Sequence, residues 1–150
     1  LEDESRLIGR LAVPEVLRQT TLLAPLVVIE MDLEARVEHT YSNYILGNLL
    51  DWQARDGEAQ GFQNFADELR HNLATLQRRL GGYRFTQLAS QMDVALALHQ
   101  RGNPDAHRAW IRTLLKDYYD PMYAYQLSQK SGRVQFRGSY MEVMDYLKNC

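Results

Sequence analysis

Charged side chains follow the stretches of this sequence that are typical of buried β-strands. Acids occupy positions 2–4 directly after Leu1, and Glu30 follows the apolar, β-branched run 26–29. Arg137 ends a third short run. Parallel α/β sheets bind ligands at the carboxyl ends of their strands, where carboxylates hold Mg²⁺ or orient a water molecule. These side chains are therefore candidates for a nucleotide site, although acids at such positions also cap helices.

Other chemical motifs are missing from the 150 residues. The Gly-x-x-x-x-Gly-Lys-Ser/Thr pattern of a phosphate-binding loop does not occur. The four histidines have no metal-ligand spacing with one another or with the single cysteine, Cys150, so we expect no metal site. No Ser/His/Asp or Cys/His arrangement indicates a nucleophile.

The charge of the chain is unevenly distributed. Residues 1–61 carry a net charge of −6, whereas residues 62–116 carry eight Lys and Arg against four Asp and Glu, a net +4. A basic section within an acidic chain is a candidate surface for a polyanion such as a nucleic-acid backbone. The alternative is an arginine-rich helix face exposed to solvent. The candidate nucleic-acid-binding residues are Arg70, Arg78, Arg79, Arg84, Arg112 and Lys116.

A tyrosine-rich stretch, residues 116–125, follows the basic section. Its aromatic rings are candidates for stacking on unpaired bases or for packing in the core. Asp120 followed by Pro121 is the pattern of a helix N-cap and first helical residue. We therefore predict that one helix ends near Tyr118 and that the next begins at Pro121. The candidate substrate-binding tyrosines are Tyr118, Tyr119 and Tyr123.

The hydrophobic pattern predicts an α/β fold that is mostly helical, with two or three parallel strands. Asp32 is a predicted helix cap, and Ser139 with Glu142 forms a predicted capping box. We expect one truncated domain over 1–150, in which segments 1–32 and 117–150 accompany the sheet and 33–116 form a helical insertion. The expected elements are a helix from Pro14 to about 24, a strand over 26–30, helices over 33–52, 62–80, 86–100 and 104–118, a loop over 56–61, a strand over 133–137 and a final helix.

The beginning of the chain predicts that the sequence is a fragment. It starts without Met and goes at once into acids, which is how the end of a parallel strand often reads. No apolar run approaches the roughly 18 residues needed to span a bilayer. One cysteine fits a reducing, cytoplasmic setting.

Several strings are specific enough to indicate a family. They are Leu-Glu-Asp-Glu-Ser-Arg-Leu-Ile-Gly at 1–9, Pro-Glu-x-Leu-Arg at 14–18, Arg-Arg-Leu-Gly at 78–81, Tyr-Tyr-Asp-Pro-Met-Tyr-x-Tyr-Gln-Leu at 118–127 and Val-x-Phe-Arg-Gly at 134–138. Together they resemble the tRNA 2-selenouridine synthase family, in the same order and from the first residue to the last.

The resemblance implies more than this chain contains. Members of the family have a rhodanese-like domain with a catalytic cysteine, followed by a phosphate-loop domain with a Gly-Lys-Thr motif. This chain is similar to the C-terminal part of that second domain, a P-loop-like parallel sheet with a lid-like helical insertion. The implied transferase uses geranyl diphosphate to S-geranylate a 2-thiouridine at the tRNA wobble position, and then uses selenophosphate to replace the sulfur with selenium.

By position in that family, Asp3 and Glu4 correspond to Walker-B-like acids, and Arg6 lies near a diphosphate position. Arg137, at the end of its strand, and the three tyrosines are the candidate substrate contacts, and whether the tyrosines face a substrate or the core stays open. With the resemblance, the basic insertion becomes a lid-like element that contacts tRNA or closes over the diphosphate. Because the catalytic cysteine and the phosphate loop are absent, we expect the fragment alone to be inactive and to carry no cofactor. The alternatives are a stand-alone RNA-binding module and a helical dimerisation domain, and the oligomeric state stays open.

Overall fold

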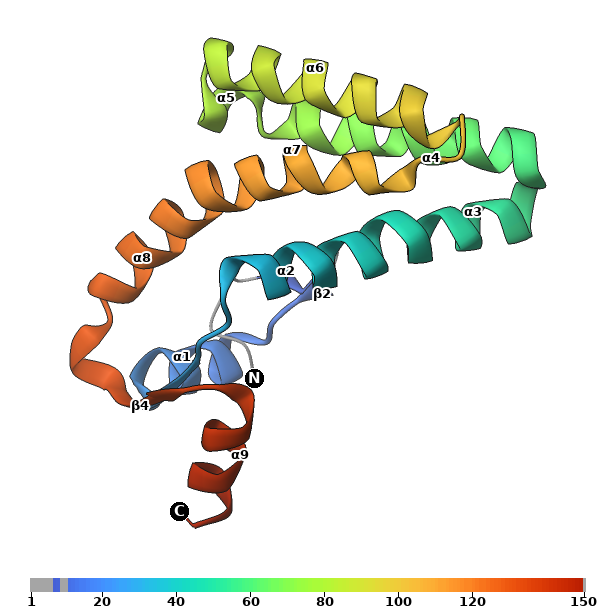
Figure 1. Cartoon of the computed structure of the whole chain (residues 1–150). Coiled ribbons are helices and arrows are strands. Elements are labelled where there is room, and N and C mark those ends of the chain that lie inside the picture. Colours follow the sequence, from blue (N-terminus) through green and yellow to red (C-terminus); the bar gives the residue numbers. More distant parts are fainter. Residues whose placement is uncertain (1–6, 9–10, 150) are drawn as a thin grey trace. The chain divides into compact units, whose positions relative to one another are not determined.

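The computed structural model describes residues 7–8 and 11–149, which form two compact units. One unit, here called the sheet unit, comprises Leu1–Met31 and Gln126–Cys150. The other, the helical unit, comprises Asp32–Tyr125. Figure 1 shows the chain and labels most of its α-helices and strands.

The sheet unit is built on two parallel strands. β3 (Leu26–Ile29) pairs with β4 (Val134–Gly138), with Val27 opposite Phe136 and Ile29 opposite Gly138. A second pair, β1 (Leu7–Ile8) and β2 (Leu11–Ala12), is antiparallel. The unit also contains α1 (Glu15–Leu23), the 3₁₀ turn η4 (Ser131–Arg133) and α9 (Tyr140–Lys148). The expectation of a mostly helical α/β fold with a small parallel sheet is confirmed.

Local contacts explain how the last helix is held on this sheet. The Ser139 side chain caps α9, and the Ser139 backbone N–H in turn donates to the Glu142 carboxylate. These two hydrogen bonds form the predicted capping box. Val143 is 3% exposed, and the Tyr146 ring stacks on Phe136 with the ring centres 4.5 Å apart. These contacts place α9 against β3 and β4.

The helical unit consists of long helices connected by short turns. Its elements are α2 (Leu33–Thr40), the π-helix η1 (Tyr41–Gly47), α3 (Asn48–Asp56), α4 (Glu58–Thr75), α5 (Gln77–Leu80), α6 (Gly82–His99), the 3₁₀ turn η2 (Pro104–Ala106), α7 (His107–Leu114), the π-helix η3 (Leu115–Tyr119) and α8 (Asp120–Ser128), whose last residues belong to the sheet unit. Asp32 caps α2 as predicted, since its side chain accepts a hydrogen bond from the Ala35 N–H at 2.9 Å.

The core of the helical unit lies where these helices face one another. Helix α4 packs on α3 and α6, and α7 packs on α6 and α2 (Figure 1). Phe65 and Ile111 are at most 1% exposed. Other buried members of the core are Val37, Tyr41, Ile45, Leu49, Leu69, Leu73, Leu80, Leu88, Met92, Leu96 and Trp110.

The predicted helix start at Pro121 is wrong. Asp120 has helical backbone angles, φ −60° and ψ −48°, so α7, η3 and α8 follow one another without a break. The Asp120 N–H donates to the carbonyl of Leu115, five residues back. Proline lacks an N–H and collides with the carbonyl four residues before it, and a wider π turn relieves this conflict without ending the helix.

Two further expectations about boundaries are also wrong. Residues 58–61 are not a loop but the first turn of α4, and Gly57 alone, at φ +81°, makes the reversal from α3. The helix expected to begin at residue 86 begins at Gly82 instead, after Gly81 turns the chain at φ +77°. In both places a single glycine makes the connection, because φ values this positive cost little only for glycine.

None of the helices in residues 7–8 and 11–149 is both long enough and apolar enough to cross a membrane.

Candidate nucleic-acid interface and strand-end site

The carboxyl ends of the two parallel strands bring a glutamate and an arginine together in the sheet unit. Glu30 Oε1 lies 3.6 Å from Arg137 Nη1, and both side chains are about half exposed. The Glu30 backbone N–H donates to the Gly138 carbonyl at 2.8 Å, which fixes the end of β3 beside β4. The candidate residues Asp3, Glu4 and Arg6 lie outside the described residues.

Ion pairs connect α2 to α7 along the helical unit. Arg112 donates to both carboxylate oxygens of Glu34, at 2.6 and 2.5 Å. Arg108 binds Glu38 at 2.8 and 2.9 Å, also contacts Asp105, and lies 3.7 Å above the Tyr41 ring. The hydrogen bonds from Arg112 lower the pKa of Glu34. Arg112, a candidate nucleic-acid contact, is therefore already paired with an acid of its own unit.

Arg70 is also paired, although it lies in the basic section. Its guanidinium reaches Asp93 Oδ1 at 2.9 Å and Asp67 Oδ1 at 3.3 Å. These contacts join α4 to α6 on an exposed face.

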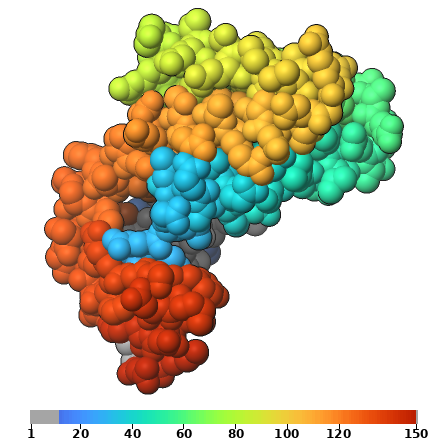
Figure 2. Space-filling view, viewed as in Figure 1, coloured from blue at the N-terminus to red at the C-terminus, as the bar shows by residue number. Residues whose placement is uncertain are grey.

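Four other arginines of the basic section make no ion pair with any residue that the structure describes, and three of them lie close together in the sequence. Arg78, Arg79 and Arg84 are exposed, and they make no ion pair with any residue that the structure describes. They belong to α5 and the first turn of α6, which we call the basic turn (residues 77–84). Between Glu68 and Asp93 the sequence contains no acid. Figure 2 shows this part of the chain, in yellow-green, at one end of the helical unit.

The tyrosines of η3 and α8 contact one another. Tyr118 and Tyr119 meet edge to face, with ring centres 4.9 Å apart, and Tyr119 stacks on Tyr123 at 6.2 Å. Tyr118 packs against the core, whereas Tyr123 is 42% exposed. Lys116 lies on the same segment and is exposed. The structure therefore brings the three candidate tyrosines into one row, with one end on the core.

Two histidines, one fully and one partly buried, form a chain of hydrogen bonds with a tryptophan. Trp110 Nε1 donates to His107 Nδ1 at 2.9 Å, and His107 Nε2 lies 3.2 Å from His99 Nδ1. His107 is fully buried, and this burial lowers its pKa to about 4, with a smaller effect from His99. Since Nδ1 of His107 accepts a proton-bearing N–H, its own proton lies on Nε2. Within the described ranges, no three His, Cys, Asp or Glu side chains are grouped as metal ligands would be.

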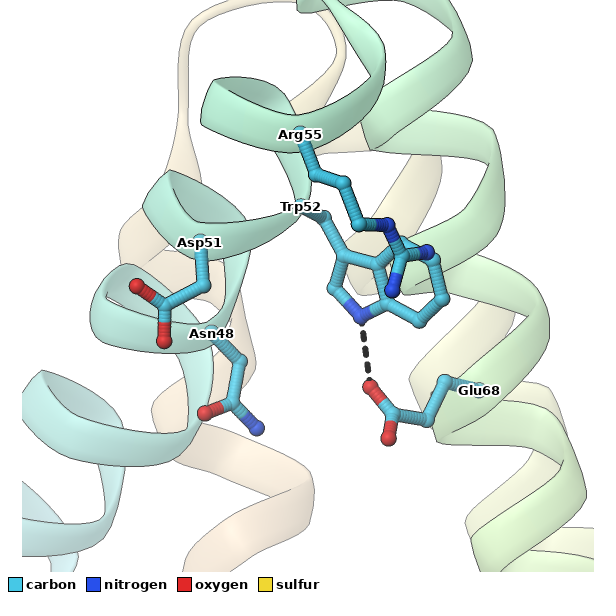
Figure 3. Close-up of a pocket in the computed structure, with 5 residues that line it drawn as sticks. All are labelled: Asn48, Asp51, Trp52, Arg55 and Glu68. Atoms are coloured by element: carbon cyan, nitrogen blue, oxygen red, sulfur yellow. Dashed lines mark hydrogen bonds between the residues drawn. The ribbon is translucent and has the colours of Figure 1, made fainter.

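A pocket between α3 and α4 was not anticipated from the sequence. Its volume is about 360 Å³, and it is lined by Asn48, Asp51, Trp52, Arg55 and Glu68 (Figure 3). The Trp52 indole N–H donates to Glu68 at 2.7 Å, and the Arg55 guanidinium lies 3.7 Å above the indole ring. This hydrogen bond gives the indole N–H a partner and joins α3 to α4, so the two side chains contribute to helix packing.

The sequence reasoning also missed Tyr83. This residue lies between Gly82 and Arg84 in the basic turn and is 83% exposed. The signal in the sequence is its setting, because a tyrosine beside a double glycine and among three arginines is a candidate stacking residue.

The structure places this chain in the class of mostly helical α/β proteins. It contains a parallel pair of strands and a helical unit that includes the basic turn. The whole chain, residues 1–150, matches the family described as tRNA 2-selenouridine synthase AAA domain, and the chain belongs to this family. The resemblance seen in the sequence strings is thereby confirmed.

Similar proteins from several bacteria are named tRNA 2-selenouridine synthase. A tRNA 2-selenouridine synthase of Hahella chejuensis is 54% identical over 146 residues, which is 97% of this chain and 38% of that protein. Those of Verminephrobacter eiseniae and Cupriavidus necator are 45% and 42% identical over 149 residues, which is 99% of this chain and 41% of each relative. The chain thus spans about two fifths of the length of these relatives. No solved structure matches it.

Proposed function

We propose that this chain is part of a tRNA-modifying transferase that places selenium at the wobble uridine of tRNA. The support is its membership of the tRNA 2-selenouridine synthase family and the names of its relatives. In this proposal the whole enzyme S-geranylates a 2-thiouridine with geranyl diphosphate and then exchanges the geranylthio group for selenium from selenophosphate. The rhodanese-like domain and the phosphate-loop segment come from the rest of the protein, so the 150 residues alone are inactive.

The contribution of this chain that we infer is contact with tRNA through the basic turn. The observation that carries it is that Arg78, Arg79 and Arg84 are exposed and have no acidic partner among the described residues. Elsewhere in the helical unit the arginines at positions 36, 55, 70, 108 and 112 are each paired with carboxylates, and only the exposed Arg101, beyond the end of α6, also lacks an ion pair with the described residues. A free guanidinium group binds phosphate oxygens and releases the counterions of the nucleic acid. A guanidinium group that is paired with a carboxylate must first break that ion pair. Lys116, also exposed, is a further candidate on a different helix.

The strand-end pair supports a second, smaller part of the proposal. Arg137 has five N–H donors, and its one ion pair within the described residues is a 3.6 Å approach to Glu30, which leaves donors to bind a diphosphate or selenophosphate oxygen. Asp3, Glu4 and Arg6 are proposed for the same site by family position. Tyr118, Tyr119 and Tyr123 are proposed as substrate contacts, of which Tyr123 is the most exposed.

The test is tRNA affinity of the full-length protein with both Arg78 and Arg79 changed to alanine. We expect binding at moderate salt to weaken by about tenfold or more, because two phosphate contacts are lost. A matched control, Arg18→Ala with Lys148→Ala, also removes two positive charges, but from residues paired with Glu15 and Asp145 in the sheet unit. Equal loss in both double variants would mean that net charge, and not the basic turn, governs binding.

A further inference from the structure

The side chain of Tyr83 does not contribute to the packing of the residues that the structure describes. At 83% exposure it is the most exposed aromatic side chain among those residues, and it makes no side-chain hydrogen bond or ring contact with any of them. Most other tyrosines of the helical unit have such contacts: Tyr41 bonds to Asp105, and Tyr118 packs on the core. Isolated exposed aromatic rings do occur on protein surfaces, so exposure alone decides nothing.

The local fold determines where the ring lies. Leu80, 6% exposed, anchors α5 in the core, and Phe85 packs against the same core from the first turn of α6. Between these anchors the chain turns at Gly81 and continues through Gly82, so neither preceding residue has a side chain that covers the ring. The two hydrophobic anchors, one on either side of the double glycine, fix the backbone around Tyr83, and its ring is exposed to solvent.

The charge around the ring indicates its ligand. The exposed guanidinium groups of Arg78, Arg79 and Arg84 belong to the same turn, and no acid lies between residues 69 and 92. An aromatic ring among unpaired cations is the combination that binds single-stranded nucleic acid, because a base stacks on the ring while the cations bind the flanking phosphates. A protein partner for an apolar ring would not require this excess of positive charge.

We propose that Tyr83 is a stacking platform for one unpaired base of the bound tRNA, and that Arg78 and Arg79 hold the phosphates beside that base. This inference rests on the proposed tRNA binding and adds the nucleotide contact that the arginines alone do not provide. The ligand class is an unpaired RNA nucleotide, of any base identity, since every base has a face on which an aromatic ring stacks.

The experiment compares Tyr83→Ala and Tyr83→Phe in the full-length protein, with tRNA affinity measured at several salt concentrations. Phenylalanine keeps the ring, and alanine removes it. We expect Tyr83→Ala to weaken binding roughly 5- to 100-fold, the range for loss of one stacked base, with an unchanged salt dependence because no ion contact is lost. We expect Tyr83→Phe to bind within about threefold of the unchanged protein. Circular dichroism checks that both variants fold.

A second measurement detects stacking directly. A single-stranded RNA oligonucleotide containing 2-aminopurine is titrated with the protein, and its fluorescence is quenched when the modified base stacks. Quenching by the unchanged protein and by Tyr83→Phe, and its loss in Tyr83→Ala, is the expected result. If the unchanged protein binds tRNA and the Arg78→Ala/Arg79→Ala variant does not, while Tyr83→Ala binds and quenches normally, the stacking proposal alone is overturned. If the unchanged protein binds no tRNA, the proposed function is overturned together with it.

Discussion

Arg36 and Asp120 form a two-point ion pair within the helical unit, in which Arg36 Nη2 lies 3.0 Å from Asp120 Oδ2 and Nη1 contacts the other carboxylate oxygen. The pair joins α2 to the first residue of α8, at the point where Pro121 enters a continuous helix. The guanidinium lowers the pKa of the Asp120 carboxyl. Asp120 therefore acts across the fold and not as the cap of a new helix.

Loss of this ion pair is expected to destabilise the helical unit moderately. Asp120→Asn leaves the shape of the side chain but removes its charge, and we expect the free energy of unfolding to fall by about 1 kcal/mol, since both side chains are about one-third exposed and screened by water. Denaturant unfolding measures this change. Asp117→Asn, an exposed neighbour three residues earlier, is the control and is expected to have little effect. A larger effect from Asp117→Asn would contradict the assignment.

The burial of His107 predicts that the stability of the protein decreases in mild acid. The folded pKa of His107, about 4, lies below its ordinary value of 6.5, so the unfolded chain binds the proton first. The stability due to the neutral ring is complete above pH 6.5 and is lost as the pH falls toward 4, by about 2 kcal/mol at pH 5. Unfolding free energies measured between pH 7 and pH 5 test this slope.

Two variants separate His107 from the other histidines. His107→Phe removes the titrating ring and is expected to flatten the dependence of stability on pH. A smaller pH dependence is expected to remain because burial also lowers the pKa of His99. His71→Gln changes an exposed histidine and should leave the slope as it was. A slope unaffected by His107→Phe would rule out this origin.

The close crossing of α3 and α4 depends on Gly61. A Cβ at this position would lie 2.6 Å from Gln53 Cα and 2.8 Å from the Trp52 carbonyl carbon, which are backbone atoms that cannot turn aside. We expect Gly61→Ala to destabilise the protein by about 1–3 kcal/mol, despite the better helix propensity of alanine. Gly82→Ala has open space around its Cβ and serves as the control in thermal unfolding. Equal melting temperatures for the two variants would show that the helices do not cross this closely.

Helix α1 of the sheet unit exposes apolar side chains, and in the proposed full-length enzyme we expect another part of the protein to cover them. Val16 is 81% and Leu23 86% exposed in this chain. Changing both to serine is expected to alter the stability of the 150-residue chain by less than about 0.5 kcal/mol each, but to lower the melting temperature of the full-length protein. Val94→Ser, at an exposed position of the helical unit, should be neutral in both. Equal stability of the full-length protein with and without the α1 changes would refute this covering.

Local patterns could be predicted from the sequence, whereas tertiary pairing could not. The β-branched run 26–29, the Asp32 cap and the Ser139–Glu142 box depend on residues within a few positions of one another, and all three formed as expected. The Asp120–Pro121 pattern failed because a π turn and an ion pair with Arg36, 84 residues away, kept the helix continuous.

The same distinction applies to the candidate interface. The sequence identified a basic section, but it could not tell that Arg112 binds Glu34, 78 positions earlier, while Arg78 and Arg79 have no such partner among the described residues. Tyr83 escaped notice because exposure depends on which neighbours fold against a ring, and periodicity does not report that.

The salt dependence of tRNA binding by the full-length protein tests the central claim most directly. A plot of the logarithm of the association constant against the logarithm of salt concentration has a slope proportional to the number of phosphates contacted. The account predicts that Arg78→Ala/Arg79→Ala reduces the magnitude of this slope by about 1.5 to 2, while the paired-charge control Arg18→Ala/Lys148→Ala leaves it unchanged. An unchanged slope in the Arg78→Ala/Arg79→Ala variant would contradict the assignment of the basic turn to tRNA.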